Sequence, residues 1–134
     1  LAENAAALPN VRRVAYPGLA SHPNHEVAAE QMLGQYGSVL SIELAGGRPA
    51  AFAFLNALQL VDLSNNLGDA KSLACHPCTT THRVLSPEDR EGAGITEGLV
   101  RVSVGLEHAD DLWRDIEQAA AKAAGAAALE ASAA

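Results

Sequence analysis

An arginine stands inside a valine-rich run at residues 99–104, Leu-Val-Arg-Val-Ser-Val. Strand alternation places the valines on one face, toward a core, and Arg101 and Ser103 on the other face. A guanidinium offers a rigid fork of donors that matches a carboxylate with two parallel hydrogen bonds, so Arg101 is suited to gripping an amino-acid substrate. From the pattern alone, a solvent-exposed strand arginine is the favoured interpretation.

Two polar turns offer further candidates. Residues 65–69, Asn-Asn-Leu-Gly-Asp, have the composition of a turn, and the Asn66 amide can donate to a carboxylate oxygen. Residues 79–82, Thr-Thr-Thr-His, form a hydroxyl-rich turn in which such side chains usually bond their own backbone. From the pattern alone we therefore interpret these hydroxyls as local turn contacts, and His82 as a residue that caps a turn.

Cys75, Cys78 and His82 have the residue types of a zinc site, since thiolates and imidazoles bind zinc and C-x-x-C is a common ligand spacing. A structural zinc site usually needs a second ligand pair, and the next candidate, His108, is distant in sequence. We therefore expect no metal and interpret the cysteine pair as a chance occurrence. The sequence also contains no glycine-rich phosphate loop and no nucleophile elbow.

Periodicity predicts the elements that position these residues. Strands are predicted at residues 11–16, 38–44 and 99–104, and residues 61–75 are expected to form two short extended pieces. Helices are expected at residues 24–36 and 49–60, at a Ser-Pro-Glu-Asp start from residue 86, and from residue 110 onward. This order predicts the α+β class, with a small, mainly antiparallel sheet covered by helices on one face. Residues 121–134 are rich in alanine, and we expect this tail to fray.

Length and composition limit the partners. The 134 residues suit one domain with a single core. A net charge of −7 argues against nucleic acid and anionic membranes as partners, and no apolar run is long enough for a membrane span. The two cysteines are too few for a disulfide framework, which favours a reducing, cytoplasmic location. The chain begins with Leu1 rather than Met, which predicts a cut inside a longer protein.

Three blocks of sequence carry a family resemblance. They are residues 62–69 (Asp-Leu-Ser-Asn-Asn-Leu-Gly-Asp), 76–82 (His-Pro-Cys-Thr-Thr-Thr-His) and 99–107 (Leu-Val-Arg-Val-Ser-Val-Gly-Leu-Glu). Together they resemble the C-terminal domain of the Cys/Met-metabolism family of pyridoxal-phosphate enzymes, over residues 11–119. The resemblance implies that Arg101 binds the substrate α-carboxylate, that Asn66 lies beside this arginine, and that Thr81 lies near the substrate. Sulfhydrylases of the family typically carry Asn at the position of Asn66, where its lyases and cystathionine synthases typically carry Ser. The chain therefore looks most like the O-succinylhomoserine sulfhydrylase subgroup.

The same resemblance implies a division of labour. The lysine that holds pyridoxal phosphate belongs to a larger N-terminal domain, and Lys71 and Lys122 lack the Ser-x-Thr-Lys setting of that lysine. We therefore expect residues 1–120 to form a substrate-recognition domain that has no catalytic residue and is inactive alone. The complete protein is expected to be a homotetramer that makes homocysteine for methionine biosynthesis from sulfide and O-succinylhomoserine or O-acetylhomoserine. A cystathionine γ-synthase, a methionine γ-lyase, and a free-standing metal-binding or interaction module remain alternatives.

Overall fold

The computed structural model describes the backbone of residues 1–133 and the side chains of residues 1–126. Within this range five strands form one sheet in the order β1 (Val11–Ala15), β2 (Val39–Leu44), β5 (Leu99–Ser103), β4 (Leu73–Cys75) and β3 (Asp62–Leu63). The pairs β1–β2, β2–β5 and β4–β5 are antiparallel, and β3–β4 is parallel. The sheet is therefore mainly antiparallel, as the sequence predicts.

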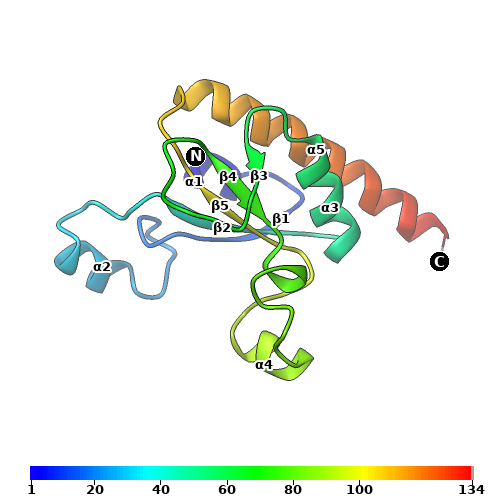
Figure 1. The fold of residues 1–134 in the computed structure, drawn as a ribbon, viewed down its shortest axis with the longest axis horizontal. Coiled ribbons are helices and arrows are strands. Elements are labelled where there is room, and N and C mark those ends of the chain that lie inside the picture. The colour runs from blue at the N-terminus through cyan, green and yellow to red at the C-terminus, as the bar shows by residue number, and fades with distance from the viewer. Residues whose placement is uncertain (134) are drawn as a thin grey trace.

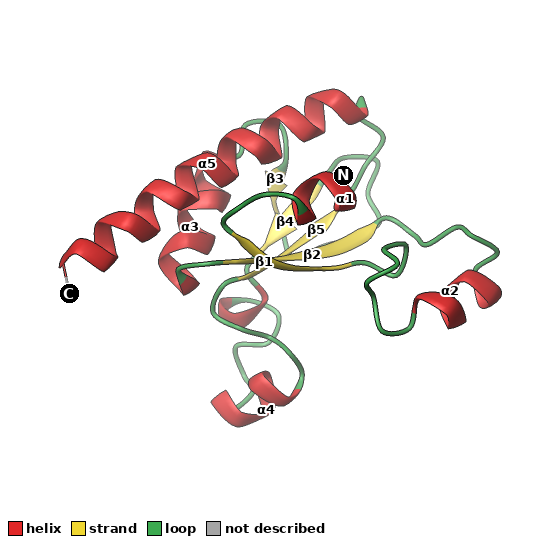
Figure 2. Ribbon diagram, turned by 180° about the vertical axis from the view of Figure 1, so that it is seen from behind, coloured by secondary structure: helices red, strands yellow, loops and turns green. Residues whose placement is uncertain are grey.

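Three helices cover one face of the sheet: α1 (Ala2–Ala6), α3 (Gly47–Ala57) and α5 (Ala109–Ala133). In Figures 1 and 2, α5 runs across the domain beside α3, while α2 (His25–Gln31) and α4 (Pro87–Gly92) project away from the sheet. A short 3-10 helix, η1 (Pro77–Thr79), follows β4. The predicted α+β class, with helices packed on one face, is confirmed. No helix in the described part of the chain is long and apolar enough to cross a membrane.

The core lies between the sheet and α3 with α5. On β2 the alternation predicted from the sequence buries Leu40, Ile42 and Leu44, while the residues between them are only half-buried. Opposite them Phe54 of α3 and Ile116 of α5 are almost completely buried. Burying one such side chain contributes about 1.5–3 kcal/mol, so this layer holds the strands in place.

Two of the predicted helices differ from expectation in their limits. The predicted helix at residues 24–36 ends at Gln31, because Leu33 and Gly34 have positive φ angles of 51° and 76°. None of its residues is buried, and Val27 is 52% exposed, so the helix has no apolar surface to lengthen against. The helix predicted at residues 49–60 covers Gly47–Ala57 instead, and it begins directly after Gly46, which has a φ of 98°.

Helix α4 begins as the sequence predicts. The hydroxyl of Ser86 accepts a hydrogen bond from the Asp89 backbone N–H at 3.1 Å, and a proline occupies the first turn. At the other end of the chain, α5 is helical as far as Ala133, and Ala123 is fully buried. Residue 134 and the side chains of residues 127–134 lie outside the described residues, so the fraying of the 121–134 tail stays a prediction.

Candidate functional site

Arg101 lies in the middle of β5 on the face opposite the α3–α5 layer. Its cross-strand neighbours are Ser41 on β2 and Cys75 on β4. The Arg101 guanidinium donates through Nη2 to the backbone carbonyls of Asn65 at 2.8 Å and Asn66 at 3.2 Å. Among the described residues its Nε and Nη1 donate to no protein group. Nε and Nη1 therefore remain available as donors to an anionic ligand, while both bidentate edges of the guanidinium (Nε with Nη2, and Nη1 with Nη2) include the nitrogen that the carbonyls use.

Asn66 therefore lies beside Arg101, as the resemblance implies, but the contact runs through its backbone carbonyl. The Asn66 N–H donates to the Ser64 hydroxyl at 3.2 Å, which shapes a tight turn after β3. The side chain of Asn66 is exposed. No hydrogen bond among the described residues uses its side-chain amide, and the role of this amide toward a substrate stays a prediction.

Thr81 lies apart from this pair in the turn that follows η1. Its hydroxyl bonds Nδ1 of His82 at 2.8 Å, and the residue is exposed. The neighbouring Thr80 hydroxyl donates to the backbone carbonyl of His76 at 2.7 Å, which is the local pattern expected of such a turn. No contact in the described part of the chain joins Thr81 to Arg101, and its secondary role near a substrate stays a prediction.

A cavity of about 360 Å³ borders the Arg101 site. It opens between α3 and the β3–β4 edge, and it is lined by apolar and polar groups that include Phe52, Asn56, Asn65, Cys75 and His76. Asn65 connects the cavity to the Arg101 site, because it lines the cavity and its backbone carbonyl accepts a hydrogen bond from the Arg101 guanidinium. The volume lies in the range of small-molecule sites. The open sheet face and this cavity together form the concave part of the domain nearest to the predicted site.

The cysteines and histidines that suggested a metal site are bonded in another way. His76 is 2% exposed, its Nε2 donates to the carbonyl of Glu97 at 2.9 Å, and its Nδ1 is hydrogen-bonded to the Thr79 hydroxyl at 2.9 Å. Cys78 donates its S–H to the Glu97 carboxylate at 3.2 Å. Among the described residues no group of three or more His, Cys, Asp or Glu side chains is arranged to hold a metal ion. The absence of zinc from the purified protein stays a prediction.

Glu97 is the charged centre of this cluster. Arg48 donates to both of its carboxylate oxygens, at 2.6 and 2.9 Å. The hydrogen bonds from Arg48 and then Cys78 lower the pKa of Glu97 to about 2. Burial, followed by the bond to Glu97, raises the pKa of the Cys78 thiol. In this arrangement the Cys78 thiol stays protonated at neutral pH and donates its hydrogen bond to Glu97.

The two lysines do not fit a covalent bond to pyridoxal phosphate. The Lys71 ammonium pairs with the Asp62 carboxylate on the surface, and the hydrogen bond to Asp62 raises the pKa of Lys71 above its ordinary value. Cofactor attachment requires a neutral amine, and a lowered pKa favours it. Lys122 is exposed on α5. The absence of a covalent cofactor bond to either lysine stays a prediction.

Sequence reasoning missed a second set of polar residues, which hold the segment carrying Asn66. Asp115 on α5 is 6% exposed and accepts from the backbone N–H groups of Gln59 and Leu60 at 2.8 Å and of Val61 at 3.0 Å. Glu107 accepts from the N–H and the hydroxyl of Ser72, both at 2.7 Å. Glu107 lies in the 99–107 block that carries the family resemblance, so the sequence did single out its position. Asp115 was not singled out, because in the sequence it resembles any acidic residue on the exposed face of a helix.

Comparison with known proteins identifies the family of the chain. A family model described as Cys/Met metabolism PLP-dependent enzyme matches residues 1–121. An O-succinylhomoserine sulfhydrylase from Pseudomonas aeruginosa is 50% identical over 116 residues, which are 87% of this chain and 28% of that protein. An L-methionine gamma-lyase from Pseudomonas putida is 51% identical over 119 residues, which are 89% of this chain and 30% of that protein.

A solved structure of cystathionine gamma synthase from Xanthomonas oryzae pv. oryzae, in complex with aminoacrylate and cysteine, superimposes with a TM-score of 0.88 at 40% identity. The match covers 93% of this chain and 32% of that one. The chain therefore spans less than a third of the length of these relatives. Similar identity to a sulfhydrylase and to a lyase does not separate the subgroups, so the preference that Asn66 suggested for a sulfhydrylase stays a proposal. The chain belongs to the family of pyridoxal-phosphate-dependent enzymes of cysteine and methionine metabolism.

Proposed function

We propose that this chain is the C-terminal, substrate-recognition part of a sulfhydrylase that replaces the γ-acyl group of O-succinylhomoserine or O-acetylhomoserine with sulfide. The products are homocysteine and the released succinate or acetate. The observation that carries the proposal is the Arg101 guanidinium, which is fixed on the open sheet face by two backbone carbonyls of the turn that contains Asn66.

The positively charged Arg101 guanidinium makes the main contribution of this domain to binding the substrate carboxylate. The bonds to Asn65 and Asn66 use Nη2 and hold the guanidinium plane, so the Nε and Nη1 donors are oriented before a ligand arrives. A substrate α-carboxylate accepts charge-assisted hydrogen bonds from these donors, and the Asn66 amide adds a donor from the side. Orientation in advance reduces the entropy that binding costs.

The bond-breaking steps belong outside this chain. Pyridoxal phosphate, when bound, supplies the electron sink for the reaction. The part of the complete protein that precedes this domain provides the attachment lysine, and we propose that the protein acts as a homotetramer in the cytoplasm. The residues of this chain bind and orient the amino acid, and their removal should therefore affect substrate binding before it affects the cofactor.

A second candidate is a methionine γ-lyase, because a relative with that name is 51% identical. The two activities separate in one assay of the full-length gene product. We expect homocysteine from acyl-homoserine and sulfide at a kcat/KM at least about tenfold above that for 2-oxobutanoate release from methionine, a difference of about 1.4 kcal/mol in transition-state binding. The opposite ranking would establish the lyase. Absence of both activities would refute both candidates.

A further inference from the structure

The turn that carries Asn66 is fastened to the chain segment that follows Arg101. Ser103, two residues after Arg101, accepts at its hydroxyl from the Gly68 N–H at 2.9 Å. The Leu106 N–H donates to the carbonyl of Ala70 at 2.8 Å. These two hydrogen bonds therefore join segment 68–72 to segment 103–107 on either side of the point where the segments cross.

The crossing is a backbone contact that depends on one glycine. A Cβ atom on Gly105 would lie 2.4 Å from the carbonyl oxygen of Ala70 and 2.5 Å from the carbonyl carbon of Lys71. Both are backbone atoms, which cannot move aside as a flexible side chain can. The Gly105 N–H donates to the Ser72 hydroxyl at 2.8 Å, and Ser72 is fully buried. We call Ser72, Ser103, Gly105 and Glu107 the clasp.

Glu107 completes the clasp with a charge pattern that only a carboxylate satisfies. The Ser72 hydroxyl accepts from Gly105 and gives its proton to Oε2 of Glu107, while the Ser72 N–H donates to Oε1. Both oxygens must accept, and a glutamine would turn an NH₂ group toward one of the donors. Burial raises the pKa of Glu107, but the hydrogen bonds from Ser72 outweigh it, so that the pKa lies below its ordinary value and the group is charged at neutral pH.

We propose that the clasp is a positioning device for substrate recognition: it sets the turn at residues 65–67, and through the two carbonyls of that turn it sets the guanidinium of Arg101. The inference rests on the proposed function for its substrate. Residues 65–70 are exposed and contribute nothing to the apolar core. Opening the clasp should therefore free the turn while the α3–α5 layer stays packed.

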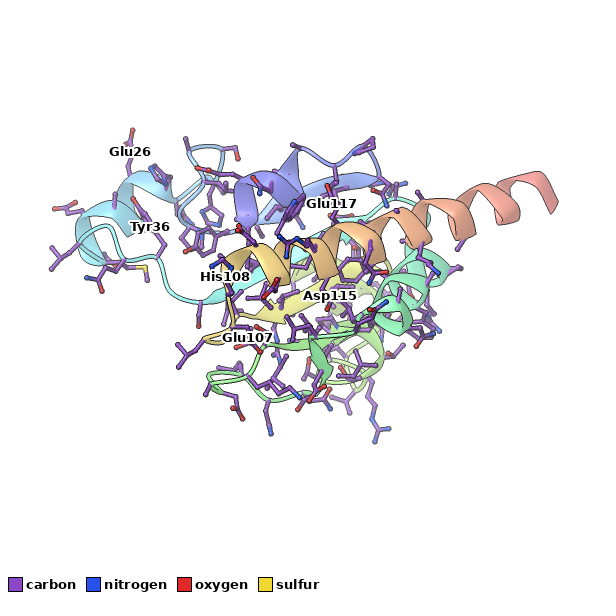
Figure 3. All side chains as sticks on the ribbon, turned by 90° about the horizontal axis from the view of Figure 1, so that it is seen from above. Glu26, Tyr36, Glu107, His108, Asp115 and Glu117 are labelled. Carbon is purple, nitrogen blue, oxygen red and sulfur yellow. The ribbon has the colours of Figure 1, made fainter. Side chains whose placement is uncertain are left out.

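The first test uses this chain alone, with Glu107→Gln as the variant and Glu117→Gln as the matched control. Figure 3 labels both side chains, Glu107 ahead of α5 and Glu117 on the helix, and Glu117 is exposed. In Glu107→Gln the backbone amides of Ser72 and Gly105 should exchange with deuterium roughly ten to a hundred times faster by NMR, as expected for local opening of these bonds. Amides of the β2–β5 ladder, and all amides of the control, should be unchanged.

The second test uses the full-length enzyme. Glu107→Gln should raise KM for acyl-homoserine roughly ten- to a hundredfold with kcat within about threefold, the signature of lost uniform binding, while Glu117→Gln leaves both constants unchanged. If Glu107→Gln does not fold, Ser103→Ala, which removes only the acceptor for the Gly68 N–H, replaces it in both tests, and the exchange of the Gly68 amide is then the readout in place of Ser72 and Gly105.

The outcomes separate the two proposals. Unchanged exchange at Ser72 and Gly105 overturns the clasp and leaves the role of Arg101 untouched. Faster exchange with an unchanged KM shows that the clasp orders the turn without positioning Arg101, and it too overturns the inference. A normal KM in Arg101→Ala refutes the proposed function itself, whatever Glu107 does.

Discussion

Asp115 offers a stability prediction that can be worked out from its contacts. Its carboxylate accepts from three successive backbone N–H groups between α3 and β3, at 2.8, 2.8 and 3.0 Å. In Asp115→Ala, water can reach Gln59, which is exposed, but the Val61 N–H is buried and loses its partner. One orphaned donor together with the loss of charge-assisted bonds costs about 3 kcal/mol, or about 10 °C in Tm for a domain of this size.

Graded variants and pH sharpen the test. Asp115→Asn keeps one acceptor oxygen, so it should lose about half as much, whereas Asp111→Asn removes only a surface pair with Arg114 and should cost less than about 1 kcal/mol. Burial raises the pKa of Asp115, but the backbone hydrogen bonds outweigh it, and the pKa lies below its ordinary value of 3.8. The stabilisation is therefore present above the pKa of the unfolded chain and is lost as pH falls through the lower folded value.

Urea unfolding followed by circular dichroism measures these differences. We expect the gap between the native chain and Asp115→Asn to be constant from neutral pH to about pH 5 and to shrink by about pH 3. A cost below about 0.5 kcal/mol in Asp115→Ala, or a gap that persists unchanged at low pH, would refute the reasoning.

Three further predictions concern groups elsewhere in the chain. Incubation with pyridoxal phosphate and borohydride should leave no stable adduct on Lys71 or Lys122, and a mass increase mapped to either lysine would contradict this. Elemental analysis should find no stoichiometric zinc, whereas about one zinc per chain that disappears in a Cys75→Ala, Cys78→Ala double variant would reverse our interpretation of the cysteine pair. Gly98→Ala should destabilise the domain by about 1–3 kcal/mol in urea unfolding, because the added Cβ would lie 2.4 Å from a backbone carbonyl oxygen of β2. An unchanged urea midpoint would contradict this, since it would mean that the backbone at the end of β2 moves aside without cost.

The regular elements could be predicted because their side chains alternate or repeat against a core. The strand at β2 and the apolar stripe of α5, with Leu112 and Ile116 buried, are direct consequences of that periodicity. The end of α2 was missed because the prediction continued through Gly34, a residue type that commonly ends helices and has a φ of 76° here, whereas the positive φ of Leu33 carries no sequence signal. The parallel pairing of β3 with β4 was missed because such short strands carry too few side chains to define a register.

The candidate site also contains residues that the sequence could predict and residues that it could not. Arg101 and Asn66 were found because a sequence frame marks them, and their proximity was implied by the resemblance. The bonds of Asp115 to Val61 and of Glu107 to Ser72 join residues 54 and 35 positions apart. An acidic residue that accepts from distant backbone N–H groups looks, in sequence, like any surface acid. Only the fold brings its partners to it.

The most direct test of the central claim is the kinetics of Arg101→Ala in the full-length enzyme. The guanidinium lies away from the core layer, so Tm and cofactor absorbance should stay close to those of the unmodified enzyme. Loss of the charge-assisted bonds to the substrate carboxylate should lower kcat/KM for acyl-homoserine by roughly two to four decades, and Arg101→Lys should recover only part, because an ammonium keeps the charge but loses the planar arrangement of donors. Near-normal turnover by Arg101→Ala, or unfolding of the domain in its place, would contradict the assignment of this arginine to substrate recognition.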